Sequence, residues 1–182
     1  MDYSQQQLQI CIDGRDEAVR GTAEPVPVED ITTPEMQQYF DDLIEAMIRY
    51  DGIGIASPQV GFLLQAVIIH SEYASEYTES DEHFVLINPR IVSASPKSRT
   101  MEEGCLSVPG VFGPIERAQK VRVKGYDRHG NQVDIKTKSF LARVLQHEID
   151  HLHGVLYIDN ATELYERTVS SSALAAARDE EV

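Results

Sequence analysis

The chain has 182 residues, of which 42% are hydrophobic and 25% charged, and this is enough for one globular domain with a sizeable core. Its formal net charge is −14, so the overall field opposes attraction to nucleic-acid phosphates or anionic lipid, and we expect no direct nucleic-acid binding. No segment approaches about eighteen consecutive apolar residues, so we expect no membrane association.

Residues 32–50 carry a helical pattern. Thr32 and Thr33 can cap the first turn, Pro34 fits inside it, and apolar side chains then recur every 3.6 residues. The apolar positions are Met36, Phe40, Leu43, Ile44, Met47 and Ile48. We therefore predict an amphipathic helix, followed from Gly52 to Gly61 by a glycine-punctuated loop.

Extended structure is predicted for three of the segments that follow. The apolar run 62–70 indicates a strand, 84–92 another, and 121–135 a hairpin that turns through 127–131. The acidic, aperiodic segment 71–83 favours a solvated loop.

A second helix is predicted over residues 139–153. Phe140 and Val144 would face the core, and Gly154 would stop the helix. The last segment, 163–182, could form a short helix but is charged and rich in serine and alanine, so its order is uncertain. No repeat or composition shift marks a second domain. We expect one catalytic domain over residues 1–182, of the α+β class.

The second helix contains a metal-binding pattern. His147 and His151 are four residues apart, which places them about 40° apart on one helix face. Glu148 lies about 100° around from His147, where it could reach a metal-bound water instead of the ion. A bound cation lowers the pKa of its water towards about 7, so Glu148 could act as general base and then as general acid. Many helices carry this short pattern by chance without binding metal.

A catalytic site of this type needs a third protein ligand. The metzincin pattern fails, because its third histidine would fall at Tyr157. Glu163 or Glu166 could complete a gluzincin-type site, whereas Cys105 lies upstream in a turn-rich segment and offers a thiolate. The alternative for Cys105 is a buried free cysteine packed as a small apolar residue. Four further histidines are interpreted as surface or packing residues: His70, His83, His129 and His153.

Three separated segments together resemble the signature motifs of the peptide deformylase family: GIGIASPQ at 52–59, EGCLS at 103–107 and QHEIDH at 146–151. Their order and spacing agree with the family, and the resemblance extends from about residue 16 to about residue 159. It implies an α+β fold with mixed or antiparallel sheets around a central metal-bearing helix. The implied reaction removes the formyl group from the N-terminal formyl-methionine of nascent polypeptides and releases formate.

The resemblance also implies roles for individual residues. Cys105, His147 and His151 would bind one divalent ion, expected to be Fe²⁺ physiologically, with Zn²⁺ or Ni²⁺ as other occupants. Glu148 would be the general base and acid. The amide of Gln59 and the backbone N–H of Leu106 would stabilise the oxyanion. The peptide would lie as an added strand beside residues whose side chains are mostly small or absent, namely Gly52, Ile53, Gly54, Glu103 and Gly104.

The sequence departs from the family pattern at several positions. Ser57 replaces a usual alanine. Arg143 stands where bacterial members usually have an apolar residue that lines the methionine pocket, so either its guanidinium turns to solvent or the pocket is reshaped. Arg117 could pair with Asp150 or Glu103, or be a plain surface arginine. The acidic C-terminal end does not support ribosome docking through a basic helix.

The remaining expectations concern context. With two cysteines and no N-terminal basic stretch before an apolar run, we expect a cytoplasmic protein in a reducing compartment. We also expect a monomer. Another metallohydrolase, such as an HExxH peptidase, and a catalytically silent metal protein remain as alternatives.

Overall fold

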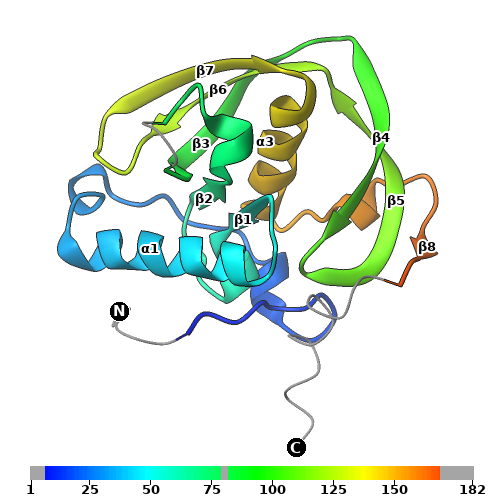
Figure 1. The fold of residues 1–182 in the computed structure, drawn as a ribbon, viewed down its shortest axis with the longest axis horizontal. Coiled ribbons are helices and arrows are strands. Elements are labelled where there is room, and N and C mark those ends of the chain that lie inside the picture. The colour runs from blue at the N-terminus through cyan, green and yellow to red at the C-terminus, as the bar shows by residue number, and fades with distance from the viewer. Residues whose placement is uncertain (1–6, 79–81, 169–182) are drawn as a thin grey trace, which may run out of the picture.

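The structure is a computed structural model that describes residues 7–78 and 82–168. Within these ranges, the chain forms two antiparallel sheets with helices packed against them (Figure 1). The larger sheet has the order β1-β2-β3-β6-β7 and the smaller one β4-β5-β8. Their strands are Gly54–Ala56 (β1), Ala66–Ile69 (β2), Phe84–Ala94 (β3), Ser98–Cys105 (β4), Val108–Ala118 (β5), Lys120–Tyr126 (β6), Gln132–Lys138 (β7) and Tyr165–Glu166 (β8). The predicted α+β class is confirmed.

Helix α1, Pro34–Arg49, confirms the first helical prediction. Thr33 is the N-cap, and its side chain accepts a hydrogen bond from the backbone N–H of Met36. Of the predicted apolar positions, Met36, Phe40, Leu43 and Met47 are buried, Ile44 is partly buried, and Ile48 is 54% exposed. The periodicity therefore located the helix and most of its core contacts correctly.

The larger sheet is covered on both faces, which explains why β2 and the first half of β3 are continuous apolar runs. Successive side chains of a strand point to opposite faces. Ala66, Ile68, Val85 and Ile87 belong to the core formed with α1. Val67, Ile69, Phe84 and Leu86 belong to the core formed with the second principal helix. Figure 1 shows that helix, α3, in the middle of the molecule between the strands of the two sheets.

Helix α3, Ser139–His151, was also predicted. Val144 faces the core as expected, but Phe140 does not, because it lies at the first turn and is 37% exposed. The chain turns away at Gly154, which has a positive φ of 70°. A Cβ atom there would lie 2.2 Å from the carbonyl oxygen of Arg20, so only glycine fits this stop.

Several predicted boundaries are wrong. The segment 52–61 is not a plain loop, since it contains β1 and a 3-10 helix over Ser57–Val60 (η3). The following strand starts at Ala66, not at residue 62. The segment 71–83 begins with a short helix, Ser71–Ala74 (α2). The predicted turn-rich segment around Cys105 is the tip of a long β4–β5 hairpin.

Three other short helices complete the described elements: Glu17–Arg20 (η1), Val28–Asp30 (η2) and Tyr157–Asp159 (η4). At the C-terminus, Tyr165 and Glu166 pair with β5, so the expected short helix does not start there. Residues 169–182, the rest of the predicted tail, lie outside the described residues. No helix of the described part is long and apolar enough to span a membrane.

Candidate metal centre and active site

A cleft of about 470 Å³ opens between β1, β4 and α3. β1 and β4 are each the edge strand of their sheet, so the cleft separates two edges. Ten of the eleven site residues predicted from the sequence line it: Gly52, Ile53, Gly54, Gln59, Glu103, Gly104, Cys105, Leu106, His147 and Glu148. The eleventh, His151, is 1% exposed and lies behind the cleft wall.

Cys105, His147 and His151 come together at the base of this cleft. Their donor atoms all lie within 4.8 Å of one another, and the Cys105 sulfur is 3.3 Å from Nε2 of His151. A sulfur and an imidazole nitrogen bound to one ion, with bonds of about 2.3 and 2.1 Å, can be separated by at most about 4.4 Å. The 3.3 Å separation of Cys105 and His151 is within this limit, and one thiol with two imidazoles is a donor set that suits a transition-metal ion.

Local structure positions each of these donors. Cys105 ends β4 at a register irregularity between Glu103 and Cys105, where the hairpin turns towards α3. His147 and His151 lie one turn apart on α3, with ring centroids 5.0 Å apart. Among the described residues, this is the only group of three metal-ligating side chains so arranged.

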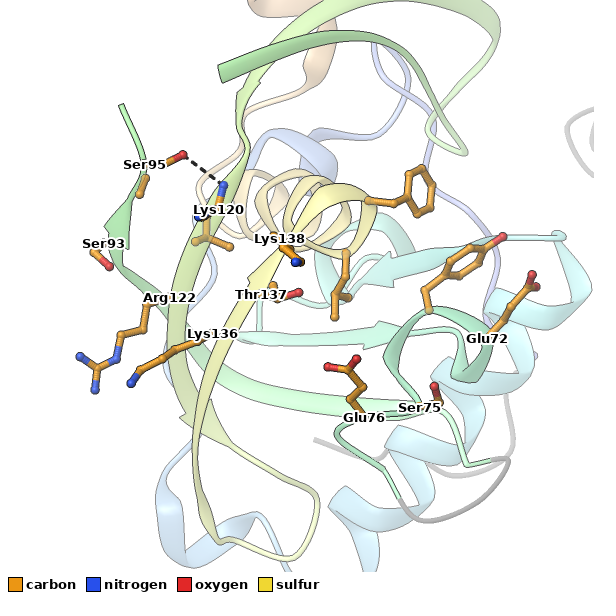
Figure 2. A pocket seen from close by; sticks show the side chains of 15 residues that line it. Glu72, Ser75, Glu76, Ser93, Ser95, Lys120, Arg122, Lys136, Thr137 and Lys138 are labelled. Carbon is orange, nitrogen blue, oxygen red and sulfur yellow. Dashed lines mark hydrogen bonds between the residues drawn. The ribbon is translucent and has the colours of Figure 1, made fainter. Parts of the chain in front are cut away.

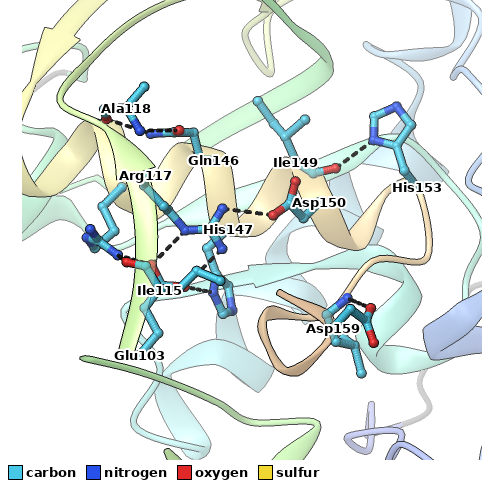
Figure 3. Close-up of polar contacts among 12 residues, drawn as sticks. Glu103, Ile115, Arg117, Ala118, Gln146, His147, Ile149, Asp150, His153 and Asp159 are labelled. Atoms are coloured by element: carbon cyan, nitrogen blue, oxygen red, sulfur yellow. Dashed lines mark hydrogen bonds and ion pairs between the residues drawn. The ribbon is translucent and has the colours of Figure 1, made fainter. Parts of the chain in front are cut away.

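A buried carboxylate orients the first histidine (Figure 3). Glu103, which is 8% exposed, accepts a hydrogen bond of 2.9 Å from Nδ1 of His147. This leaves Nε2 of His147 to face a cation, the arrangement found around ligating histidines generally. Burial alone would raise the pKa of Glu103, but its hydrogen bonds with His147 and Arg117 lower that pKa to about 2. Glu103 is therefore an anion that holds the ring in place.

Two arginines hold Glu103 in turn. Arg117 donates to both of its oxygens, at 2.6 and 2.9 Å, and also to Asp150 at 2.8 Å. The sequence offered these two carboxylates as alternatives, and the arginine uses both. Arg143 donates to Glu103 and to the carbonyl oxygens of Ile115 and Arg99.

The position of Arg143 decides between the two possibilities raised by the sequence. It is 5% exposed, so the expectation that its guanidinium turns to solvent is wrong. Its side chain lines the cleft, while its charged end is held by Glu103 and two carbonyl oxygens. The pocket wall is therefore reshaped by a buried arginine.

Charge on the two imidazoles is strongly unequal. Burial works against a charge on His147, but its hydrogen bonds with Cys105 and Glu103 raise its pKa to about 10. Burial, together with the charge of His147, lowers the pKa of His151 well below its usual value. Because a protonated imidazole cannot bind a metal ion, a cation at this site would take the place of the proton on His147.

Glu148 is 4% exposed, and burial raises its pKa to about 7. Its Oε2 atom has no hydrogen-bond partner among the described residues. A buried polar atom of this kind usually has a partner, and Glu148 lines the cleft. Its carboxyl group is thus placed and tuned to exchange a proton with a molecule that enters there.

Gln59 has a fixed orientation. Its side-chain oxygen accepts a hydrogen bond of 2.9 Å from the backbone N–H of Ala56. Its side-chain nitrogen therefore points the other way, 3.4 Å from the Cys105 sulfur and 3.3 Å from the hydroxyl of Ser107. The amide donor thus lies beside the three candidate ligands, at the end of the cleft where a carbonyl oxygen would enter.

The glycines of the cleft make room for protein atoms. A Cβ at Gly54 would lie 2.6 Å from Oε1 of Glu148, and one at Gly104 would lie 2.6 Å from the ring of Phe112. At Gly52 the nearest atom would be a methyl carbon of Leu106, at 3.1 Å. The sequence attributed these glycines to space for a peptide; the structure shows that each also admits a neighbouring side chain.

Two contacts in the site were not expected from the sequence. Tyr157, considered only as a failed ligand position, lies with its ring stacked against His147 and donates to the carbonyl oxygen of Val111. Ser57 is fully buried and accepts a hydrogen bond from the hydroxyl of Tyr39. Both depend on long-range contacts that no local pattern signals.

Comparison with known proteins gives a consistent result. Residues 8–167 match the polypeptide deformylase family. A peptide deformylase from Desulforudis audaxviator is 40% identical over 135 residues, which cover 74% of this chain and 83% of that protein. "Peptide deformylase 3" from Shewanella oneidensis is 44% identical over 151 residues, 82% of this chain and 86% of that one. The crystal structure of the Thermotoga maritima peptide deformylase superimposes with a TM-score of 0.77 at 33% identity, covering 87% of this chain and all of that one.

Proposed function

Because this chain belongs to the polypeptide deformylase family, we propose that Cys105, His147 and His151 hold its catalytic cation and that Glu148 moves the proton. The enzyme is a metal-dependent hydrolase that removes the formyl group from the N-terminus of nascent polypeptides. The proposed residue roles rest mainly on one observation. The donor atoms of one sulfur and two imidazoles lie within 4.8 Å of one another, beside a buried carboxyl group.

A divalent ion held by these residues would lower the pKa of a coordinated water from about 15.7 towards about 7. Glu148, with its pKa raised to about 7, accepts the proton as the nucleophile forms and returns it to the leaving nitrogen. Glu103 keeps the ring of His147 oriented throughout, because it stays ionised at neutral pH.

The formyl oxygen gains negative charge during attack. The side-chain N–H of Gln59 and the backbone N–H of Leu106 are the donors we assign to it. The hydrogen bond that Gln59 accepts from Ala56 supports this assignment, since it fixes the direction of the amide.

The peptide itself fits the space between the two edge strands. An extended chain could pair with the backbone near Ile53 on one side and near Gly104 on the other, with Gly52, Gly54 and Glu103 in the same wall. The first side chain would meet the part of the cleft lined by the stem of Arg143 and by Val144.

For the ion we propose Fe²⁺ under physiological conditions, with Zn²⁺ or Ni²⁺ as alternative occupants, because a thiolate with two imidazoles suits all three. We further propose a single catalytic domain over residues 1–182, a monomeric state and a cytoplasmic location. Ribosome association through the acidic C-terminal end is not part of the proposal.

The test compares three variants in an anaerobic assay with Fe²⁺. Formate is measured from formyl-Met-Ala-Ser, and cleavage of an unformylated peptide is measured in parallel. Glu148→Ala should retain metal and lose turnover by about three or more orders of magnitude, because the proton acceptor is gone. Cys105→Ala should retain less metal after dialysis.

Cys11→Ala is the matched control, since Cys11 is the other free thiol and lies outside the ligand group. It should keep both metal and activity. Normal metal binding and turnover in Cys105→Ala would contradict the ligand assignment, and cleavage of the unformylated peptide without formate release would indicate a peptidase.

A further inference from the structure

Positive charge is concentrated in one part of this acidic chain. All five of its lysines lie between residues 97 and 138. The β6–β7 hairpin, residues 120–138, carries six lysines and arginines against two aspartates, a net charge of +4 in a molecule of net charge −14. The net charge therefore does not describe what a partner would meet at this hairpin.

The strand register gathers four of these cations on one face of the sheet (Figure 2). Lys120 lies directly opposite Lys138, and Arg122 opposite Lys136. Valines and an isoleucine alternate with them and are buried on the other face, against α3. Like charges directly opposite one another destabilise a sheet, so this arrangement has a cost within the fold.

Internal carboxylates neutralise this charge only in part. Asp134 pairs with Arg122 at 2.5 Å and with Lys124 at 3.7 Å, and Arg128 in the turn pairs with Asp41 of α1 at 2.8 Å. Over residues 7–78 and 82–168, no carboxylate lies within ion-pair distance of Lys120, Lys136 or Lys138, all of them exposed. These three lysines are available to an external anion.

The same face leads into a cavity of about 290 Å³. Five cations and no carboxylate line it, together with the ring of Phe140; the cations are Arg99, Arg117, Lys120, Lys138 and Arg143. Arg117 and Arg143 form its buried side, where Glu103 and Asp150 already pair with them. Lys120 and Lys138 link the cavity to the open face. Phe140 also lines the substrate cleft, so the cavity adjoins the rim of the active site.

We propose that this surface, which we call the cationic face and define as Arg99, Lys120, Arg122, Lys136 and Lys138, binds the phosphates of a single-stranded RNA. Side chains two residues apart on a strand lie about 6.6–6.8 Å apart. The pair Lys120 and Lys138 and the pair Arg122 and Lys136 are therefore separated by this distance along the strands, and each pair could contact one phosphate. The exposed ring of Phe140, beside the cavity, offers a base a surface to stack on.

The shape of the face supports this partner. The cationic face lines one side of an open hollow, and Glu72 and Glu76, from α2 and the segment after it, line another side (Figure 2). Their negative charges disfavour an anionic strand there, so β6 and β7 are its favoured path. The repulsion from the rest of the molecule is screened beyond about 8 Å at physiological ionic strength. Binding should therefore occur locally and weaken steeply with salt. This inference replaces the expectation, drawn from net charge alone, that nucleic acid is excluded.

The experiment uses a fluorescently labelled 12-nucleotide single-stranded RNA of mixed sequence, with anisotropy measured from 20 to 200 mM salt. Each phosphate contact contributes a slope of about −0.7 in log K against log salt. Lys136→Gln with Lys138→Gln should weaken binding about tenfold at low salt and make the slope shallower by about 1.4, because two contacts are lost. Formate release from formyl-Met-Ala-Ser should be unchanged in this variant, which shows that it is folded.

The matched control removes two positive charges elsewhere, in Arg15→Gln with Arg49→Gln. Arg49 ends α1, whereas α1 contacts the β6–β7 turn through Gln37 and Asp41 nearer its other end. Neither Arg15 nor Arg49 lines the hollow or the cavity beside the cationic face. This control should change RNA affinity by no more than about twofold. The proposal is overturned if the wild type does not bind the RNA, if both double variants weaken binding equally, or if poly-glutamate or phosphatidylserine vesicles bind more tightly than RNA. Binding of inorganic phosphate without RNA binding would overturn it too.

Discussion

Glu148 occupies the space that a side chain at Gly54 would fill. The glycine lies in β1 and the glutamate in α3, and a Cβ on the glycine would lie 2.6 Å from Oε1 and 2.9 Å from Cδ of the glutamate. Because Gly54 has no side chain, the carboxyl group of Glu148 can occupy its position in the cleft. This role of the glycine does not depend on any contact with substrate.

We predict that Gly54→Ala displaces this carboxyl group. Because displacements near 1 Å can cost about a hundredfold in rate, kcat for formate release should fall by about 10- to 100-fold while bound metal stays at the wild-type level. Steady-state kinetics and metal analysis on the same samples measure both.

Gly52→Ala is the control, since its Cβ would lie 3.1 Å from a methyl carbon of Leu106, 3.2 Å from the carbonyl oxygen of Gly54 and 3.3 Å from Met47, each farther than the 2.6 Å contact at Gly54. Its effect on kcat should be smaller. Equal losses in the two variants would argue for general crowding of the cleft. At this scale the sequence named residues that line one cleft. It attributed the glycines only to the peptide, because their neighbours come from distant segments.

Helix α3 is joined to the β4–β5 hairpin by a buried arginine. Arg143 donates to Glu103 and to two carbonyl oxygens on the hairpin strands, and its side chain is 6% exposed. Removing one member of a buried ionic group leaves its partners unsatisfied. Glu103 would keep Arg117 and His147, but the carbonyl oxygens of Ile115 and Arg99 would lose a donor.

Arg143→Leu should therefore lower the free energy of unfolding by about 2–4 kcal/mol, measured by urea denaturation of the metal-loaded protein. Arg122→Leu is the matched comparison, because Arg122 is an exposed arginine in a surface ion pair with Asp134. It should change stability little. A fully stable Arg143→Leu protein would mean that the helix and hairpin are held by apolar contacts alone.

Among the elements, the two principal helices, β3 and the β6–β7 hairpin were predictable from sequence. Their apolar residues recur at a clear period, and the hairpin has a polar turn. The strand β1 and the hairpin β4–β5 were not. β1 has three residues in a glycine-rich segment, and β4 carries charged residues because it is an edge whose outer face is not part of the core.

The candidate metal site connects the two layers of the molecule. Cys105 comes from the end of β4 in the smaller sheet, whereas His147 and His151 come from α3, which packs on the larger sheet. An ion bound to all three would cross-link these layers and stabilise the fold as any ligand of the native state does.

Chelation should therefore lower the melting temperature. Free metal at about 100 times its Kd stabilises by about 2.7 kcal/mol, so returning Fe²⁺ or Zn²⁺ should restore the transition, as followed by calorimetry under anaerobic conditions. Cys105→Ala should respond weakly to added metal, and Cys11→Ala should respond as the wild type does. A melting temperature independent of metal in the wild type would show that the ion is not held across the layers.

For the whole molecule, the sequence predicted the class, the family and the residues that meet in the site. It did not predict how two sheets of different strand order place their edge strands, β1 and β4, opposite each other. That arrangement depends on register, on the β4 irregularity and on the contacts of Arg117 and Arg143, none of which leaves a local periodic pattern.

The two facing edges have a consequence for which proteins the enzyme can process. Hydrogen bonds to a main chain are the same whatever side chains follow, so a substrate held by its backbone between β1 and β4 is recognised without regard to most of its sequence. Selectivity then falls on the first residue and its formyl group. A single enzyme built this way can serve a whole proteome of unrelated N-termini.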